Sequence, residues 1–295
     1  MELLAPAKIN LHLRVGSPRS DGFHPLLSWM VTIGLFDSLS IEPSGVPGIR
    51  LTCDDPGIPT DAGNLVVRTA AAFADWLATR RPGMATQGIN VRLKKNIPAG
   101  AGLGGGSSDG ARMLSGLDAL WRLGMSAGEL AEFAARFGSD LSFFFFQPSA
   151  ICRGRGEIVS PLPRPRAGWA VLVLPQLHMP TPAVYRRFDE MGLGAPENLA
   201  PEPELADWAL LTASELLGLL RNDLEPAAFS IEPALGQLRQ EAERRLARPF
   251  RMSGSGSSLF TLYDEAAAAV VAARKAADEL SVTALAVEIG PRLDP

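Results

Sequence analysis

Five glycines among seven residues distinguish the segment Ile97-Pro98-Ala99-Gly100-Ala101-Gly102-Leu103-Gly104-Gly105-Gly106-Ser107-Ser108-Asp109. Alternating apolar residues at 89–93 precede it, and apolar residues at helical spacing follow it over 111–121. Glycine lets the backbone adopt positive φ and approach a ligand closely, and a helix N-terminus carries about +0.5 of a charge toward an anion. The segment therefore predicts a loop that binds the phosphates of a nucleotide.

Other glycine loops fit this segment less well. A Walker A loop ends in Gly-Lys-Ser/Thr, whereas Gly106 is followed directly by Ser107. The pattern Gly100-x-Gly102-x-x-Gly105 matches a dinucleotide fingerprint, but the acidic residue about 20 positions later is missing, since Glu129 belongs to a capping-box pattern. The His-Arg-Asp and Asp-Phe-Gly motifs of protein kinases do not occur. The alternative interpretation of this segment is a flexible turn that binds no ligand.

Composition and charge limit the classes of partner. The 295 residues are 46% hydrophobic and 20% charged, which suits a globular chain of two domains. The net charge of −4 favours neither nucleic acid nor an anionic membrane, so a phosphate ligand must be held by local groups. We expect a small-molecule substrate, no nucleic-acid partner and no membrane partner.

The two cysteines and the N-terminus indicate a cytoplasmic protein. Cys53 and Cys152 lack the spacing of a zinc or redox motif, and reduced thiols are the simplest interpretation. The first residues lack the pattern of a secretory signal. The aromatic run 143–146 is far shorter than the roughly 20 apolar residues that span a bilayer, so we expect it to be buried.

Hydrophobic periodicity predicts an α+β chain. Apolar residues at 9–15 alternate with Lys8, Asn10 and two further polar residues, as in a strand with one buried and one polar face. We expect Asn64 to cap a helix over 65–80, and Thr181 to cap one that begins at Pro182. A strand at 169–174, and a strand, helix and strand over 259–289, complete the pattern. The predicted domains are 1–163 and 164–295.

Five motifs carry a resemblance to the GHMP kinases, which include galactokinase, homoserine kinase and mevalonate kinase. The phosphate loop of that family has the form Pro-x-x-x-Gly-Leu-Gly-x-Ser-Ser, and the segment above is similar to it with one extra glycine. The motifs follow the family's order over nearly the whole chain. They are Pro6-Ala7-Lys8-Ile9-Asn10-Leu11, Asp21-Gly22-Phe23-His24, Gly104-Gly105-Gly106-Ser107-Ser108, Gly138-x-Asp140 and Met252-Ser253-Gly254-Ser255-Gly256.

The resemblance implies a fold and a reaction. The fold would be α+β, with an N-terminal domain like the second domain of ribosomal protein S5, a C-terminal ferredoxin-like sandwich and the active site in the cleft between them. The reaction would be transfer of a phosphoryl group from ATP to an alcohol, helped by Mg²⁺. The motifs are most similar to the branch of the family whose alcohol carries a cytidine diphosphate group.

The resemblance also assigns catalytic and ATP-binding residues. Taken alone, Lys8 on a polar strand face is usually solvated, and Asp140 after a helix is usually a cap. By resemblance, Asp140 accepts the proton of the substrate hydroxyl, and Lys8 keeps it ionised and stabilises the phosphoryl oxygens. The ATP-binding residues implied are Pro98, Gly100, Gly102, Leu103, Gly104, Gly105, Gly106, Ser107 and Ser108.

A substrate site is implied in the same way at Asn10, Phe23, His24 and Tyr185. Without the resemblance, we would expect Asn10 to make a cross-strand hydrogen bond and His24 to be an ordinary turn residue. Phe23 and Tyr185 would stack on a pyrimidine. Phe23 stands where tyrosine is usual in the family, and Leu141-Ser142 stand where Val-Pro is usual.

Several questions stay open at this point. The chain could be another GHMP kinase that acts on homoserine, mevalonate or a sugar alcohol, or a ligand sensor without catalysis on the same fold. Ser107 or Ser108 could reach Mg²⁺ through a hydroxyl, but no acidic metal ligand stands out. The chain could be a monomer or a homodimer.

Overall fold

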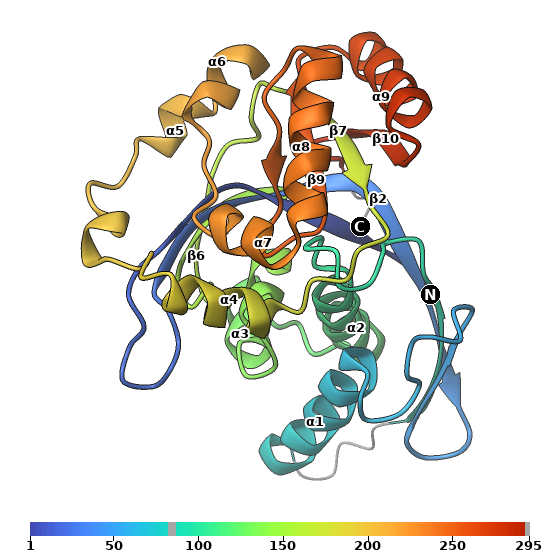
Figure 1. The fold of residues 1–295 in the computed structure, drawn as a ribbon. Coiled ribbons are helices and arrows are strands. Elements are labelled where there is room, and N and C mark those ends of the chain that lie inside the picture. The colour runs from blue at the N-terminus through green and yellow to red at the C-terminus, as the bar shows by residue number, and fades with distance from the viewer. Residues whose placement is uncertain (82–86, 293–295) are drawn as a thin grey trace. The chain divides into compact units, whose positions relative to one another are not determined.

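The computed structural model describes residues 1–81 and 87–292, which form two compact units (Figure 1). Unit 1 contains Met1–Ala7, Leu35–Ala99 and Gly104–Phe146. Unit 2 contains Lys8–Gly34, Gly100–Leu103 and the chain from Gln147 onward. Neither unit is continuous in sequence, because the chain passes between them several times.

Unit 1 combines a small sheet with helices. Residues 38–44 of β2 (Leu26–Ser44) pair antiparallel with β4 (Gly88–Lys94), which pairs in parallel with β3 (Ile49–Cys53). The helices are α1 (Leu65–Arg80), α2 (Gly105–Trp121) and α3 (Ala127–Ala134), followed by the 3-10 helix η1 (Ser139–Phe145). Apolar side chains from β4, α1, α2 and α3 form its core.

Helix capping in unit 1 follows the sequence signals. The Asn64 side chain accepts a hydrogen bond from the Val66 N–H at 2.9 Å, and the helix spans 65–80 as predicted. Ser126 and Glu129 form the expected capping box at the start of α3. Phe143 and Phe144 are buried, as predicted for the aromatic run, whereas Phe145 and Phe146 are only half-buried.

Unit 2 contains a four-stranded sheet in the order β10-β7-β9-β8, with all neighbours antiparallel. Its strands are β7 (Trp169–Leu174), β8 (Arg251–Met252), β9 (Leu259–Tyr263) and β10 (Thr283–Glu288). Helices α4 to α8 lie between β7 and β8 in the chain, and α9 lies between β9 and β10. This order and connectivity are those of a ferredoxin-like sandwich, as predicted.

The remaining elements of unit 2 complete the list. The helices are α4 (Thr181–Glu190), α5 (Leu205–Trp208), α6 (Ala213–Leu219), α7 (Glu225–Ile231), α8 (Pro233–Leu246) and α9 (Ala266–Leu280), with the 3-10 helix η2 (Pro196–Leu199). β5 (Ser149–Gly154) pairs antiparallel with residues 26–31 of β2 and with β6 (Ile158–Pro161). Thr181 begins α4 but does not cap it, since its hydroxyl bonds the Ser255 hydroxyl at 2.8 Å instead.

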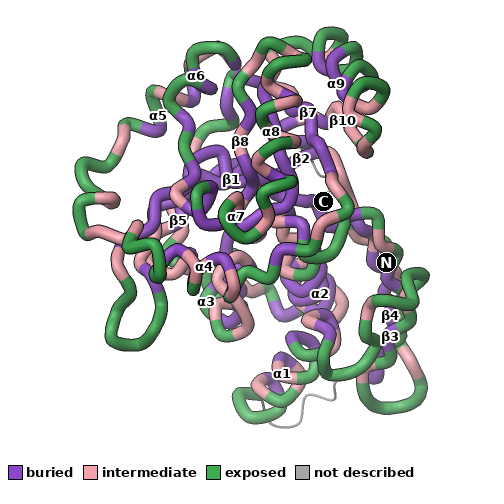
Figure 2. The backbone as a smooth tube through the Cα atoms, viewed as in Figure 1, coloured by how far each residue is buried: buried purple, intermediate pink, exposed green. Residues whose placement is uncertain are grey.

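Strand β1 (Glu2–Val15) differs from its prediction on one point. Its residues alternate as expected, but both faces are buried rather than one (Figure 2). The polar side chains have partners inside unit 2: His12 Nδ1 accepts the Arg221 N–H at 3.3 Å, and Arg14 donates to the Pro201 carbonyl at 2.7 Å. His12 Nε2 and Arg14 Nε have no hydrogen-bond partner among the described residues. The polar face is thus part of a hydrogen-bonded interior.

Within residues 1–81 and 87–292, no helix combines the length and the apolar character that crossing a bilayer requires.

Candidate active site

The glycine loop, defined as residues 98–108, turns through left-handed backbone conformations. Gly102 has a φ of +75°, and a Cβ placed there would lie 2.2 Å from the Ser253 carbonyl oxygen. Gly104 has a φ of +69° and precedes α2, whose N-terminus no side chain caps. The helix begins at Gly105, within the glycine loop itself. The amide groups of this uncapped helix start are suited to an anion.

The second glycine segment, residues 252–256, holds the part of the glycine loop that belongs to unit 2. Ser253 Oγ donates to the Gly102 carbonyl at 2.9 Å. The Ser258 N–H donates to the Ala101 carbonyl at 3.1 Å. Two chain segments about 150 residues apart are therefore packed backbone to backbone, with glycine where a side chain would collide.

Lys8 lies beside both segments. Its backbone N–H donates to the Leu103 carbonyl at 2.9 Å, and Nζ donates to Asn10 Oδ1 at 2.6 Å. A Cβ at Gly254 would lie 3.5 Å from Nζ. The side chain is only 3% exposed, so the amine sits in a dry, hydrogen-bonded setting rather than in bulk water.

Asn10 connects this lysine to the neighbouring strand. Its Nδ2 donates to Ser28 Oγ at 2.8 Å, and its backbone N–H donates to Ser253 Oγ at 3.3 Å. The cross-strand hydrogen bond expected from the strand pattern is thus present. Asn10 orients Lys8 and the second glycine segment together.

Asp140 belongs to unit 1, in the first turn of η1, whereas Lys8 belongs to unit 2. Asp140 is half-buried and follows Gly138, which the sequence motif pairs with it. The next two residues anchor the turn: Leu141 is fully buried, and Ser142 Oγ donates to the Ala131 carbonyl at 3.0 Å. These contacts fix the backbone where the family pattern has proline.

An aromatic cluster in unit 2 contains His24 and Tyr185, two of the residues predicted to hold a base, together with Phe188. The ring centroids of His24 and Tyr185 lie 5.0 Å apart, and Phe188 meets His24 edge to face at 5.9 Å. His24 Nε2 bonds Asp189 Oδ1 at 2.7 Å, which fixes the orientation of the imidazole. His24 is buried, and its neighbour Phe23 is 49% exposed.

Arg155 is a neighbour of this cluster that the sequence did not reveal. Its guanidinium lies 4.8 Å from the centroid of the Phe23 ring, within the range of a cation–π contact. The signal was weak, because an arginine in the turn between β5 and β6 has no pattern that links it to a residue 132 positions earlier. The contact restrains the ring of Phe23 despite its exposure.

A buried ionic triad lies against the glycine loop in unit 1. Lys95 Nζ donates to Asp109 Oδ2 at 2.8 Å and also pairs with Asp37. Asp37 Oδ1 accepts the N–H groups of Asn96 and Ile97 at 2.6 and 2.9 Å, at the entry to the loop. Asp109 is in α2, just after the loop. The triad therefore ties the chain before the loop to the chain after it.

Burial and charge set the protonation of Asp109. Burial raises its pKa to about 7, the attraction of Lys95 opposes the rise, and the nearby charge of Asp37 adds to it. Its Oδ1 has no hydrogen-bond partner among the described residues. One lysine thus serves two buried carboxylates.

The triad predicts a large loss of stability when its cation is removed. Lys95→Met should lower the free energy of unfolding at pH 8 by about 3–5 kcal/mol, because two buried carboxylates lose their partner. The exposed neighbour gives a matched control: Lys94→Met should change it by less than about 0.5 kcal/mol. Urea unfolding measures both, and similar small losses in the two variants would contradict the triad.

The pKa of Asp109 predicts a pH dependence of stability. Between about pH 4 and 7 the folded protein keeps a proton that the unfolded chain has released, so the contribution of Asp109 to the unfolding free energy falls as pH rises and levels off above about 7. In Asp109→Asn this contribution disappears. The difference in unfolding free energy between wild type and variant should therefore vary between pH 4 and 7; a constant difference contradicts the raised pKa.

The backbone contact at Gly102 predicts a specific cost for a methyl group. Gly124 has a similar φ of +68° but open space around its Cβ position. Gly124→Ala should therefore lower the free energy of unfolding by about 1–2 kcal/mol, the strain of an alanine in the left-handed conformation. Gly102→Ala adds a collision with the Ser253 carbonyl oxygen and should lower the free energy of unfolding by clearly more than Gly124→Ala does. Equal losses in urea unfolding would show that the two segments are not in close contact.

Comparisons with known proteins agree with this geometry. The family model of the GHMP kinases N terminal domain matches residues 64–147, and the model GHMP kinases C terminal matches residues 208–280. These matches place the chain in the class of GHMP kinases. The boundary predicted between residues 163 and 164 falls between the two matched ranges and stays a prediction.

Individual relatives narrow the class. A 4-diphosphocytidyl-2-C-methyl-D-erythritol kinase of Geobacter sp. (strain M21) is 37% identical over 273 residues, covering 92% of this chain and 93% of that protein. A kinase of the same name from Microcystis aeruginosa is 35% identical over 99% of this chain and 96% of its own length. The chain belongs to the 4-diphosphocytidyl-2-C-methyl-D-erythritol kinase family.

Solved structures support the fold. The crystal structure of a 4-(cytidine 5'-diphospho)-2C-methyl-D-erythritol kinase superposes with a TM-score of 0.76 at 34% identity, covering 99% of this chain and all of that one. A homoserine kinase from Cytophaga hutchinsonii superposes at 0.71 with 19% identity, covering 99% and 94%, and shows the shared fold alone. The predicted α+β architecture of two GHMP kinase domains is confirmed.

Proposed function

We propose that this protein transfers the γ-phosphoryl group of ATP to the 2-hydroxyl of 4-diphosphocytidyl-2-C-methyl-D-erythritol, giving ADP and the 2-phosphate, a step of the non-mevalonate route to isoprenoids. The observation that carries the proposal is the union of the glycine loop, the second glycine segment and Lys8 in one hydrogen-bonded cluster. Relatives that are 35–37% identical over most of the chain bear the name of this activity.

The proposed chemistry needs positioning and charge rather than a covalent intermediate. Amide groups of the glycine loop would hold the phosphates of ATP. Lys8, held by Asn10 and shielded from water, would stabilise negative charge on the transferred group. Asp140 would take the proton of the attacking hydroxyl, so that the oxygen can form its bond to phosphorus while the bond to ADP breaks.

Recognition of the cytidine would use the aromatic cluster. Phe23 and Tyr185 offer ring faces for the base, and Arg155 restrains the exposed ring of Phe23. In the tautomer that donates Nε2–H to Asp189, His24 Nδ1 would be an acceptor, which suits the exocyclic amine of cytosine. An alcohol that carries no aromatic base, such as homoserine or mevalonate, would have no base to place among these rings, which disfavours both as substrates.

Magnesium would accompany the nucleotide. Among residues 1–81 and 87–292 no three His, Cys, Asp or Glu side chains converge on a metal position. Ser108 Oγ is a buried oxygen without a hydrogen-bond partner in the described chain, and Ser107 next to it is half-buried. These hydroxyls fit an ion that is held mainly by phosphate oxygens, and the ion would neutralise the β- and γ-phosphates. We propose a cytoplasmic enzyme, monomeric or homodimeric.

A test of this mechanism is Asp140→Asn. Steady-state ADP release should fall by about 10²–10⁴-fold, because the amide cannot accept the hydroxyl proton, while the Kd of a non-hydrolysable ATP analogue should stay within about twofold. The exposed Asp75 supplies a charge-matched control, and Asp75→Asn should keep wild-type turnover. Unchanged turnover in Asp140→Asn would remove this residue from the reaction. Analogue binding without any turnover in the wild type would favour the ligand sensor.

A further inference from the structure

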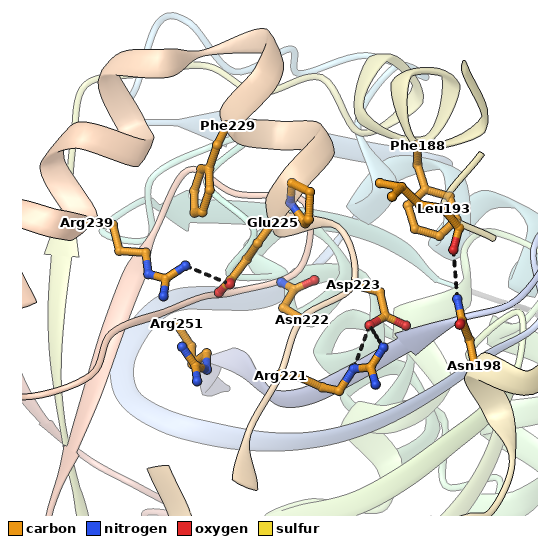
Figure 3. Close-up of a pocket in the computed structure, with 11 residues that line it drawn as sticks. Phe188, Leu193, Asn198, Arg221, Asn222, Asp223, Glu225, Phe229, Arg239 and Arg251 are labelled. Atoms are coloured by element: carbon orange, nitrogen blue, oxygen red, sulfur yellow. Dashed lines mark hydrogen bonds and ion pairs between the residues drawn. The ribbon is translucent and has the colours of Figure 1, made fainter. Parts of the chain in front are cut away.

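A cavity of about 400 Å³ opens in unit 2, and its lining includes no residue of the glycine loop. Figure 3 shows the residues that line it. Its lining combines apolar side chains with arginines and carboxylates, and the Arg239 guanidinium lies 5.7 Å from the centroid of the Phe229 ring. The apolar members are Phe188, Leu193, Pro226 and Phe229, and the polar members are Asn198, Arg221, Asn222, Asp223, Glu225, Arg239 and Arg251. The volume lies in the range of small-molecule sites.

The charges of the lining favour an anion. Three arginines face two carboxylates. Arg221 bonds Asp223 through Nε at 2.7 Å, and Arg239 bonds Glu225 at 3.0 Å, as the dashed lines in Figure 3 show. Arg251 has no ion pair in the part of the chain that the structure describes. The lining itself carries three positive and two negative charges, but Glu243 also bonds Arg239 Nε at 3.1 Å and supplies a third carboxylate. The cation available to an anion is therefore Arg251, rather than a net positive charge of the cavity.

Arg251 is nevertheless held in place. Its Nε donates to the Leu220 carbonyl at 2.7 Å and its Nη1 to the Phe250 carbonyl at 3.1 Å. These two bonds leave the Nη2 end of the guanidinium for an oxyanion. A fixed guanidinium loses little entropy when it binds phosphate or carboxylate.

The cavity wall also holds the second glycine segment. Asn222 Nδ2 donates to the carbonyls of Met252 and Gly254 at 2.8 and 2.7 Å. Glu225 Oε1 accepts the Met252 N–H at 2.9 Å. A ligand that contacts these side chains therefore acts on the backbone next to Lys8 and Gly102 without touching either residue.

We infer that this cavity is a second ligand site, which binds a small oxyanion with an apolar body through Arg251 and Phe229 and is coupled to the second glycine segment. The shared chemistry is that of a phosphate monoester or a carboxylate. By thermodynamic linkage, whatever affinity change the bound anion imposes on a ligand at the glycine segments is imposed equally in return. The coupling rests on the proposed nucleotide site, whereas the binding does not.

Calorimetric titration of the whole protein tests the binding, with phenyl phosphate and benzoate as probes in separate runs. A saturating non-hydrolysable ATP analogue is present, so that the glycine loop cannot be counted as the site. If the analogue itself fails to bind, the titration is run without it, which separates failure of this site from failure of the nucleotide site. We expect one probe molecule to bind per chain, with the better probe identifying the preferred anion.

Variants assign the site. Arg251→Gln should weaken binding at least tenfold through loss of a charge-assisted hydrogen bond. Pro226→Glu puts a negative charge on an exposed lining residue and should weaken it several-fold, which keeps the test valid if Arg251→Gln fails to fold. Arg244→Gln, at an exposed arginine outside the cavity, should bind as the wild type does. The site is overturned if no probe binds to the wild type, or if Arg251→Gln and Pro226→Glu bind the probe as tightly as the wild type does.

Amide hydrogen exchange measures the coupling between the cavity and the second glycine segment. The probe should slow exchange of amides within 252–256 in the wild type, and should slow it less in Pro226→Glu at the same sub-saturating probe concentration. Exchange at 252–256 that does not respond to a bound probe would overturn the coupling.

Discussion

The contact between Gly102 and Ser253 constrains the rest of the site. It brings two chain segments so close that the loop could not carry a side chain at the point of contact, since a Cβ at Gly102 would meet the Ser253 carbonyl oxygen at 2.2 Å. Ser253 then links the glycine loop to Asn10 by one hydroxyl, which donates to the loop and accepts from the strand. Lys8 gains its position from the same network. Glycine here is required by packing, independently of any ligand.

Buried polar groups around this contact form hydrogen-bonded networks rather than isolated pairs. Strand β1 carries Lys8, Asn10, His12 and Arg14 on a face that water does not reach, and each of these finds a partner in unit 2. In unit 1 the Asp37–Lys95–Asp109 triad holds both ends of the glycine loop. Such networks lose much stability when one member is removed, which suits a loop whose amide groups must stay in position.

The sequence predicted the elements with local signals and missed those that depend on distant contacts. Asn64 and the Ser126–Glu129 pair set helix starts through hydrogen bonds to neighbours in the chain, so α1 and α3 were predicted closely. Thr181 shows the opposite case, because its hydroxyl prefers Ser255, 74 residues away, over capping its own helix. The polar face of β1 was expected to be solvated for the same reason: nothing near it in sequence shows that other segments cover it. Arg155 and the arginines of the cavity carry no local pattern either, and only the fold brings them to their positions.

The central claim is that a cytidine diphosphate alcohol is the phosphoryl acceptor, and ADP release from the purified protein with ATP and Mg²⁺ tests it most directly. The account predicts saturable ADP release with 4-diphosphocytidyl-2-C-methyl-D-erythritol, and no release above background with homoserine or mevalonate at the same concentration. Phosphorylation of either small alcohol while the cytidine compound stays unreacted would contradict it.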